Sequence, residues 1–313
     1  MKRKALIFIS LIALLYFAVA ASTIVQTTRI KNDPCYRIID GKPPGYIVEA
    51  DRVCVPESSG QYESYFRTLE GVDVATFEEV GAGFAKDARH VYYGDAVEDR
   101  FDPKTFRHIG NGYVADRALV AYYDRFLEGA DSKTFAVFPG NYYYARDENQ
   151  VYFHDRAIPR ADPDSFEAIA EHEEYGRDRK NVYYSGRIVS QANPASLVFL
   201  NDRVTKDQRH VFCNGSLLDG LDAETFEQIG RSDYLRDGDT LYYCEKKVEG
   251  IDVAAFHVLP ATKSDQKNRI RAVWLDTCGT DGKSVVCDGE IWRWEDPEEF
   301  FSGEIPELPP YFE

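Results

Sequence analysis

A five-residue phrase recurs along the chain at nearly constant spacing, and this regularity limits the fold more than any other feature of the sequence. Its clearest form is Asp-Pro-Lys-Thr-Phe at 102–106. Copies stand at 131–135, 162–166, 193–197, 222–226 and 252–256, with weaker copies at 73–77 and 296–300. The steps between the large apolar residues that end the phrase are 29, 29, 31, 31, 29, 30 and 44 residues. A fixed period of this length is typical of tandem structural repeats.

Each repeat unit has the pattern of short strands joined by tight turns. The first residue of the phrase suits a helix N-cap, and Pro103 suits the first position of a helical turn. A second turn opens at Asp178 and at equivalent Asp residues, and the strand after it carries an aromatic pair such as Tyr183-Tyr184. Asn214-Gly215 is a strong signal for a two-residue hairpin. A unit therefore contains about four very short strands and one helical turn in ~30 residues.

These units predict an all-β protein of about seven tandem β-hairpin repeats that form a curved solenoid. Incomplete units at both ends suit the caps of a solenoid, but they also suit the strand exchange that closes a β-propeller, which is the alternative. The aromatic residues that end the phrase are expected to form one row in the core: Phe106, Phe135, Phe166, Phe226 and Phe256.

The segment from Asp178 to Tyr184, Asp-Arg-Lys-Asn-Val-Tyr-Tyr, resembles the signature of the DKNYY family of bacterial repeat proteins. Weaker copies at 87–93 and 207–213 support the resemblance, which covers about residues 70–290. The resemblance implies a bacterial protein that is exported or associated with the cell envelope. It implies no reaction, so no catalytic residue is carried over.

The chain outside the repeats divides into three further segments. Residues 1–25 have a basic start and a long apolar run with an A-x-A-type site at Ala18–Ala20, so they are either a cleaved signal peptide or a single-span membrane anchor. In both cases the rest of the chain is predicted to lie outside the cytoplasm, in the periplasm or cell envelope. Residues 26–64 form a linker and N-terminal cap, 65–300 the repeat domain with an insertion at 262–279, and 301–313 an acidic, proline-rich tail.

An even number of cysteines behind an export signal predicts disulfides. Six cysteines permit about 15 pairings, among which pairing of sequence neighbours is the simplest. It gives Cys35–Cys54, Cys213–Cys244 and Cys278–Cys287, of which the second is less regular because Cys244 aligns with Asn214 in the repeat. The alternative is that the cysteines are free, buried thiols.

The net charge of −16 disfavours binding to nucleic acid or to anionic lipid head groups. It suits a soluble protein or one with a basic protein partner, and membrane contact is expected only through the N-terminal segment.

No sequence motif indicates a catalytic centre, a cofactor or a metal site. His172 lies in Glu-His-Glu-Glu, which is not the H-E-x-x-H pattern of zinc proteases. Asp237-Gly238-Asp239 resembles the start of a calcium loop, but the twelfth position is Val248 instead of Glu. The chain is therefore predicted not to be an enzyme and to hold no cofactor.

The aromatic pairs suggest a binding face, because neighbouring residues of a strand point to opposite sides. If the valine of each strand faces the core, one tyrosine per repeat lies on the opposite face: Tyr92, Tyr122, Tyr152, Tyr183 and Tyr242. Regularly spaced tyrosines suit a contact surface. The alternative is that both faces of each sheet are buried.

Three functions follow from these features as hypotheses. The leading one is a non-enzymatic envelope protein that binds another protein, for example a toxin in the manner of an immunity protein. The second is a cell-wall glycan binder that uses the tyrosine row for stacking. The third is a hydrolase without a recognisable motif.

Overall fold

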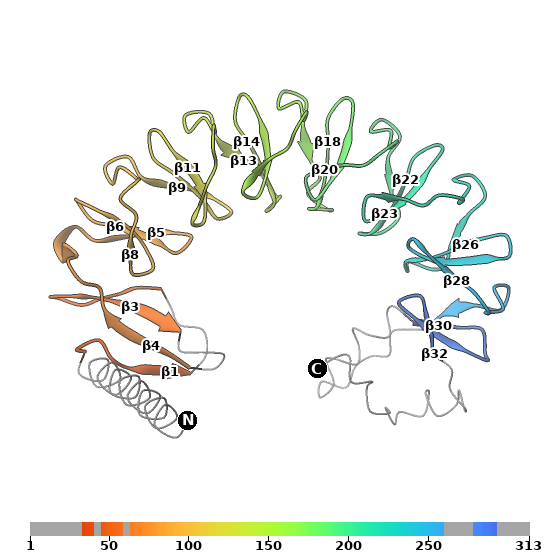
Figure 1. The fold of residues 1–313 in the computed structure, drawn as a ribbon, viewed down its shortest axis with the longest axis horizontal. Helices are drawn as coiled ribbons and strands as arrows, with labels where there is room; N and C mark the ends of the chain where they lie inside the picture. The colour runs from red at the N-terminus through yellow and green to blue at the C-terminus, as the bar shows by residue number, and fades with distance from the viewer. Residues whose placement is uncertain (1–32, 41–44, 59–62, 260–277, 293–313) are drawn as a thin grey trace, which may run out of the picture. The chain divides into compact units, whose positions relative to one another are not determined.

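The computed structural model describes residues 33–40, 45–58, 63–259 and 278–292 (Figure 1). By its internal contacts the chain divides into two compact units, Met1–Val137 and Phe138–Glu313. The predicted leader, the tail and most of the predicted insertion at 262–279 lie outside the described residues. Within the described ranges, no helix is long and apolar enough to span a membrane.

In the first unit, β1 to β12 pair in three antiparallel sheets of four. The N-terminal sheet has the strand order β1-β4-β3-β2, and the next two sheets follow chain order. The strands are β1 (Ile38–Asp40), β2 (Ile47–Val48), β3 (Val53–Ser58), β4 (Glu63–Thr68), β5 (Glu78–Gly81), β6 (Phe84–Lys86), β7 (Val91–Tyr93), β8 (Ala96–Val97), β9 (Arg107–Gly110), β10 (Tyr113–Ala115), β11 (Val120–Tyr122), β12 (Arg125–Phe126) and β13 (Ala136–Val137).

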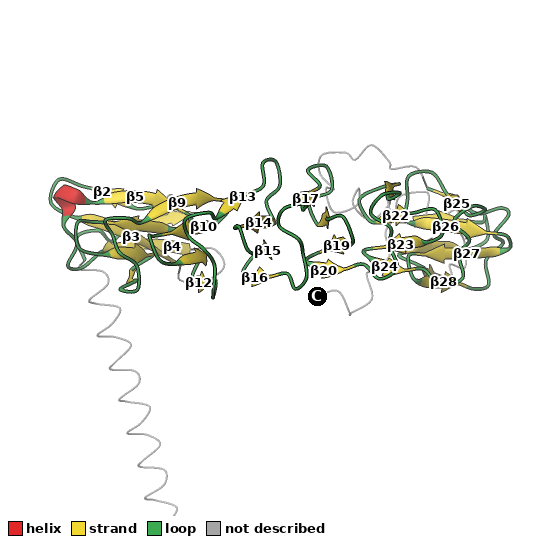
Figure 2. Cartoon of the chain, turned by 90° about the horizontal axis from the view of Figure 1, so that it is seen from above, coloured by secondary structure: helices red, strands yellow, loops and turns green. Residues whose placement is uncertain are grey.

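In the second unit every sheet is an antiparallel meander in chain order, and Figure 2 shows this order for the sheet of β25, β26, β27 and β28. Its strands are β14 (Tyr144–Arg146), β15 (Val151–Phe153), β16 (Arg156–Ala157), β17 (Glu167–Ala168), β18 (Tyr175–Arg177), β19 (Val182–Tyr184), β20 (Arg187–Ile188), β21 (Val198–Phe199), β22 (Val204–Lys206), β23 (Val211–Cys213), β24 (Ser216–Leu217), β25 (Glu227–Gln228), β26 (Tyr234–Asp237), β27 (Thr240–Tyr243), β28 (Lys246–Val248), β29 (His257–Val258), β30 (Cys278–Thr280), β31 (Val285–Cys287) and β32 (Glu290–Trp292).

The recurring phrase makes a single helical turn between sheets, as its capping residues predict. In the first copy it forms the 3₁₀ helix η1 (Val74–Thr76), capped by the side chain of Asp73, which accepts the N–H of Ala75. In a later copy the N–H of Thr105 donates to the carbonyl of Asp102 at 3.1 Å. The all-β class and the tandem four-stranded repeat are therefore confirmed.

Both faces of an internal sheet are covered by other sheets, and β19 shows how. Val182 packs in a cluster with Phe212 of the following sheet. Tyr183 points the other way and packs with Val151 and Phe153 of the preceding sheet. Because an internal sheet is buried on two sides, the hydrophobic core continues from repeat to repeat within a unit.

The aromatic residues that end the phrase fill the spaces between sheets. Phe106, Phe135, Phe166 and Phe256 are buried, and Phe226 is partly buried against the same kind of cluster. Phe166 lies so close to Gly176 that a Cβ at that glycine would be 2.4 Å from the ring. The small residue in the middle of β18 therefore makes room for the phenylalanine ring.

Candidate binding surface

An aspartate and a tyrosine five residues later form the main buried polar contact of a repeat. The Tyr183 hydroxyl donates to Asp178 Oδ2 at 2.7 Å. Asp178 Oδ1 accepts the N–H groups of Lys180 and Asn181, each at 2.7 Å. Oδ2 also accepts the N–H of Asp162, which opens the preceding five-residue phrase. One carboxylate thus connects its own turn, the next strand and the preceding helical turn.

The same pair recurs in two other repeats, where Tyr92 donates to Asp87 and Tyr152 to Asp147, both at 2.8 Å. Burial by itself would raise the pKa of Asp87, but the N–H groups of Asp73 and Arg89 and the Tyr92 hydroxyl outweigh it and lower that pKa to about 2. Burial and the hydrogen bond to Asp87 raise the pKa of Tyr92 above its ordinary value. The carboxylate therefore stays charged and the phenol neutral across the physiological range, which is the behaviour of a structural pair.

These contacts correct the predicted tyrosine contact row. Tyr92, Tyr152 and Tyr183 are 0–1% exposed, so no partner can reach their rings. Strand alternation did place them on the face opposite the valines. That face is also buried, because it packs against a second sheet. The hydroxyl of each of these tyrosines is bonded to the aspartate five residues earlier.

Tyr122 and Tyr242 do not complete the row either. Tyr122 pairs with Tyr113 across β10 and β11, as Tyr184 pairs with Tyr175, so it has the register of the second aromatic position. Ala121 therefore takes the place that Tyr183 has in β19. Tyr242 has the predicted register opposite Leu235, but it is half-buried against the cluster formed with Cys213 and Val211.

At the other end of the strands, a ladder of contacts joins consecutive sheets of the second unit. At three successive junctions, the last residue of the third strand of a sheet contacts the left-handed turn residue of the next sheet. The Tyr184 hydroxyl lies 3.3 Å from Asn214 Oδ1, and the Tyr243 hydroxyl donates to Asp288 Oδ1 at 2.6 Å. Between them, Cys213 and Cys244 occupy the same two positions and form a disulfide. The φ angles of Asn214, Cys244 and Asp288 are 50°, 48° and 50°, which confirms that the three turns are equivalent.

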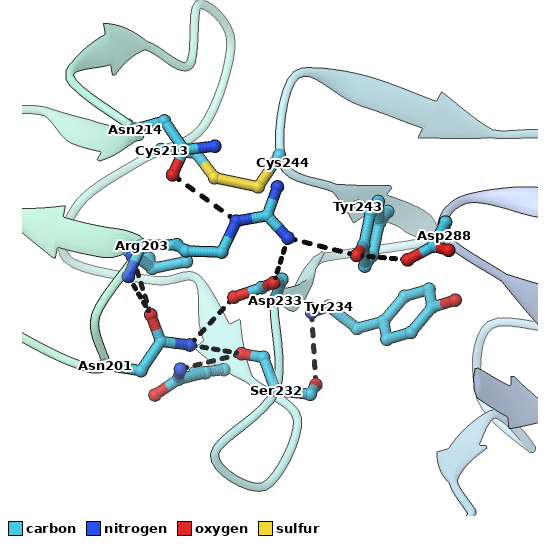
Figure 3. The surroundings of a disulfide bond; sticks show 12 residues. Asn201, Arg203, Cys213, Asn214, Ser232, Asp233, Tyr234, Tyr243, Cys244 and Asp288 are labelled. Carbon is cyan, nitrogen blue, oxygen red and sulfur yellow. Dashed lines mark hydrogen bonds and ion pairs between the residues drawn. A yellow bond between two sulfur atoms is a disulfide. The ribbon is translucent and has the colours of Figure 1, made fainter. Parts of the chain in front are cut away.

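Arg203 is the centre of a polar network around this disulfide (Figure 3). Its Nη1 donates to Asp233 Oδ2 at 2.6 Å and to the Tyr243 hydroxyl at 3.2 Å, and its Nε donates to Asn214 Oδ1 at 3.3 Å. Burial by itself would lower the pKa of Arg203, but Asp233 and Tyr243 outweigh it and raise that pKa. Burial and the hydrogen bond to Asp288 raise the pKa of Tyr243 to about 12. The network thus consists of a permanent ion pair and a neutral phenol.

All three disulfides predicted by neighbour pairing are present. Cys35–Cys54 ties the N-terminal sheet, with the Cα atoms 5.6 Å apart. Cys278–Cys287 joins directly opposed residues of β30 and β31. Cys213 and Cys244 differ in register because Cys213 ends a strand and Cys244 is the turn residue of the next sheet. This offset made their pairing less regular in the sequence.

Comparison with known proteins identifies the repeat. The DKNYY family matches residues 97–156 and 144–270, which together are more than half of the chain. The chain belongs to the DKNYY family. No curated protein and no solved structure matches it.

In the DKNYY repeat the turn between the first two strands is exposed, and one copy presents an aromatic side chain. Asn141 is buried, and its Oδ1 accepts the N–H groups of Tyr143 and Tyr144 at 2.9 and 3.0 Å. Tyr142 stands at the tip of this turn and is 64% exposed. The prediction from sequence missed it, although three consecutive tyrosines give a signal: only Tyr144 aligns with the strand-initiating Tyr113 and Tyr175.

His172 packs against an aromatic ring and an acidic side chain. His172 stacks on Phe199 with ring centroids 4.1 Å apart, and its Nδ1 lies 3.0 Å from Asp202 Oδ1. Asp237 receives the N–H of Asp222 and the hydroxyl of Thr225, as the turn aspartates of other DKNYY repeats receive such groups. Within the described ranges no group of three or more His, Cys, Asp or Glu side chains is arranged to bind a metal ion.

Proposed function

We propose that this DKNYY protein is an exported, non-enzymatic scaffold that binds another protein in the cell envelope. One observation carries the proposal. The repeat uses its aspartates and paired tyrosines inside the fold, and it presents rigid turns that are held by buried polar side chains such as Asn141. A rigid, repeated surface loses little conformational entropy on binding, which favours recognition of an extended partner.

Three observations support export. Three disulfides are compatible with folding in an oxidising compartment. The basic and apolar residues at 1–25 have the pattern of a signal peptide or anchor. The family resemblance points to the envelope as well. Contact with the membrane is proposed only through the N-terminal segment.

The acidic composition supports a basic partner, such as a toxin neutralised by an immunity protein. A net charge of −16 attracts cationic proteins and speeds their association at low salt. The alternative of glycan binding depended on an accessible tyrosine row. Because Tyr92, Tyr152 and Tyr183 are buried, that support is lost.

Affinity capture from an envelope extract tests the proposal. The tagged protein, folded with its disulfides, is expected to retain a basic protein at low salt and to release it at high salt, because screening weakens charge-driven contacts. Reduced, unfolded protein is the control for nonspecific retention. Capture of nothing beyond this control, from extracts of the native host, would contradict the proposed function.

A further inference from the structure

Tyr142 is an exposed aromatic side chain on a turn that is rigidly held. The Nδ2 group of Asn141 donates to the carbonyls of Ile169 and Glu173 at 3.2 and 3.0 Å, and its Oδ1 accepts two N–H groups of its own turn. Two of these bonds join the turn to the neighbouring repeat, and the other two hold the backbone of the turn itself. The adjacent Tyr143 packs on Phe153, with ring centroids 5.8 Å apart, and contacts His154 at 5.0 Å.

The Tyr142 ring has no structural role that explains its presence. It is 64% exposed, and it makes no hydrogen bond or ring contact with any of the described side chains. Other tyrosines of the unit, such as Tyr144 and Tyr175, are buried and bonded to the next repeat. Because a rigid aromatic side chain offers contact area at low entropic cost, an exposed one suits an interface anchor.

The turn that contacts Asn141 is acidic. It carries Glu171, Glu173 and Glu174, and the next such turn carries Asp202, whose side chain is 91% exposed. Glu174 accepts the hydroxyls of Tyr184 and Ser185 at 2.6 and 3.2 Å, which fixes its carboxylate. Glu171 and Glu173 form no ion pair with the described residues. Their charge is therefore available to an incoming cation.

We infer that Tyr142, Glu171 and Glu173 form a docking site for a basic segment of a partner protein, with a Lys or Arg side chain over the Tyr142 ring. The inference rests on the proposed function and names the surface through which the protein would bind its partner. A cation over an aromatic ring is attracted by the ring electrons, and nearby carboxylates add to that attraction. Charge complementarity selects a basic protein segment over a neutral glycan, for which the carboxylates would contribute little.

Binding of fluorescein-labelled deca-lysine to the intact, oxidised protein tests the site by fluorescence anisotropy. Tyr142→Ala is expected to weaken binding about two- to fivefold, the range for a cation–π contact at an exposed site. Tyr142→Phe keeps the ring and should bind like the wild type. Ile188→Ala, an exposed apolar truncation in the same unit, is the control for lost surface area.

Two double variants distinguish binding at this site from attraction by the acidic surface as a whole. Glu171→Gln with Glu173→Gln is expected to weaken deca-lysine binding more than the matched pair Asp164→Asn with Glu224→Gln, which lies on the turns at the opposite end of the strands. Equal loss in both pairs, together with wild-type binding by Tyr142→Ala, would overturn the inference. Because all these positions are at the surface, unchanged melting curves should accompany every variant.

Two outcomes distinguish this inference from the proposed function. If the wild type captures a salt-sensitive envelope protein and Tyr142→Ala captures it equally well, the site is wrong while the proposed function stands. If Tyr142→Ala instead loses binding to isolated cell-wall glycan while the glutamine pair retains it, the occupant is a glycan and the basic-segment inference fails.

Discussion

At the residue scale, the hydroxyl of a buried tyrosine and a carboxylate five residues earlier form a polar pair that recurs in three repeats. In the sheet of β17–β20 this carboxylate accepts four hydrogen bonds, from the amides of Asp162, Lys180 and Asn181 and from Tyr183. A buried charge is tolerated only when such donors replace water. The repeat can also lose the hydroxyl, because Phe212 stands at the tyrosine position beside Asp207.

Tyr183→Phe should therefore destabilise the protein without disturbing its fold. The substitution removes one donor from the buried Asp178 carboxylate, and we expect a loss of about 1.5–3 kcal/mol in the free energy of unfolding, the usual cost for a hydrogen bond to a charged group. Urea unfolding measures it. Tyr142→Phe, which removes an exposed hydroxyl, is the control and should leave the midpoint unchanged. Equal midpoints for the two variants would contradict the structural role of the pair.

The same carboxylates predict that the protein loses stability in acid. Hydrogen bonds outweigh burial and hold the pKa values of Asp87, Asp178, Asp207 and Asp281 below their ordinary value. Because these pKa values are lower in the folded than in the unfolded chain, the stability they provide is complete above pH ~4 and is lost as the pH falls towards 2. Urea midpoints measured from pH 7 to pH 2 should stay level and then fall. In Asp178→Asn the urea midpoint should decrease less at low pH than in the wild type. An equal decrease in both proteins would contradict the role of Asp178 in acid sensitivity.

At the element scale, the sheets of the second unit are joined by one contact that changes chemistry from repeat to repeat. A hydroxyl–amide contact at Tyr184–Asn214 gives way to the Cys213–Cys244 disulfide and then to the hydrogen bond of Tyr243 with Asp288. The disulfide therefore replaces a non-covalent contact between consecutive sheets. Arg203 and Asp233 lie beside this disulfide and form an ion pair there.

Removal of this disulfide should cost more than removal of Cys278–Cys287. The two bonds close segments with sequence separations of 31 and 9. Chain entropy gives about 3.5 kcal/mol for the longer loop and about 2.5 kcal/mol for the shorter one. Urea unfolding of the double variants Cys213→Ala with Cys244→Ala, and Cys278→Ala with Cys287→Ala, compares them under non-reducing conditions. A larger loss of stability on removal of Cys278–Cys287 would show that the chain entropy of the unfolded state does not determine what each disulfide contributes.

At the scale of the whole molecule, the three disulfides are compatible with a protein outside the cytoplasm. Export can be tested independently of any partner. An alkaline phosphatase fusion at the C-terminus should be active, since that enzyme also requires disulfides. N-terminal sequencing of the mature protein distinguishes cleavage after Ala20 from retention of an anchor. An inactive fusion, with an active one on a known exported protein as control, would contradict export.

The sequence by itself determined the repeat, its strands and its turns, because these depend on local properties. The Asp-x-x-Thr-Phe phrase predicted a capped helical turn, and Asn214-Gly215 predicted a hairpin, since both follow from backbone preferences of a few residues. Neighbour pairing of the cysteines also matched the structure. The predicted alternation of Val182 and Tyr183 was correct for the same reason.

Only the tertiary structure decided which of these side chains are accessible. Alternation shows that Tyr183 points away from Val182, but it cannot show that another sheet covers the second face. The register of Tyr122 depended on its pairing with Tyr113, and the exposure of Tyr142 on the hydrogen bonds of Asn141 to the neighbouring repeat. The sheet packing of Tyr183 and the hydrogen bonds of Asn141 join residues of different repeats, and the Tyr113–Tyr122 pair joins residues of different strands. Local preference does not encode such contacts, so burial, and with it the choice of binding surface, had to come from the packing of sheet on sheet.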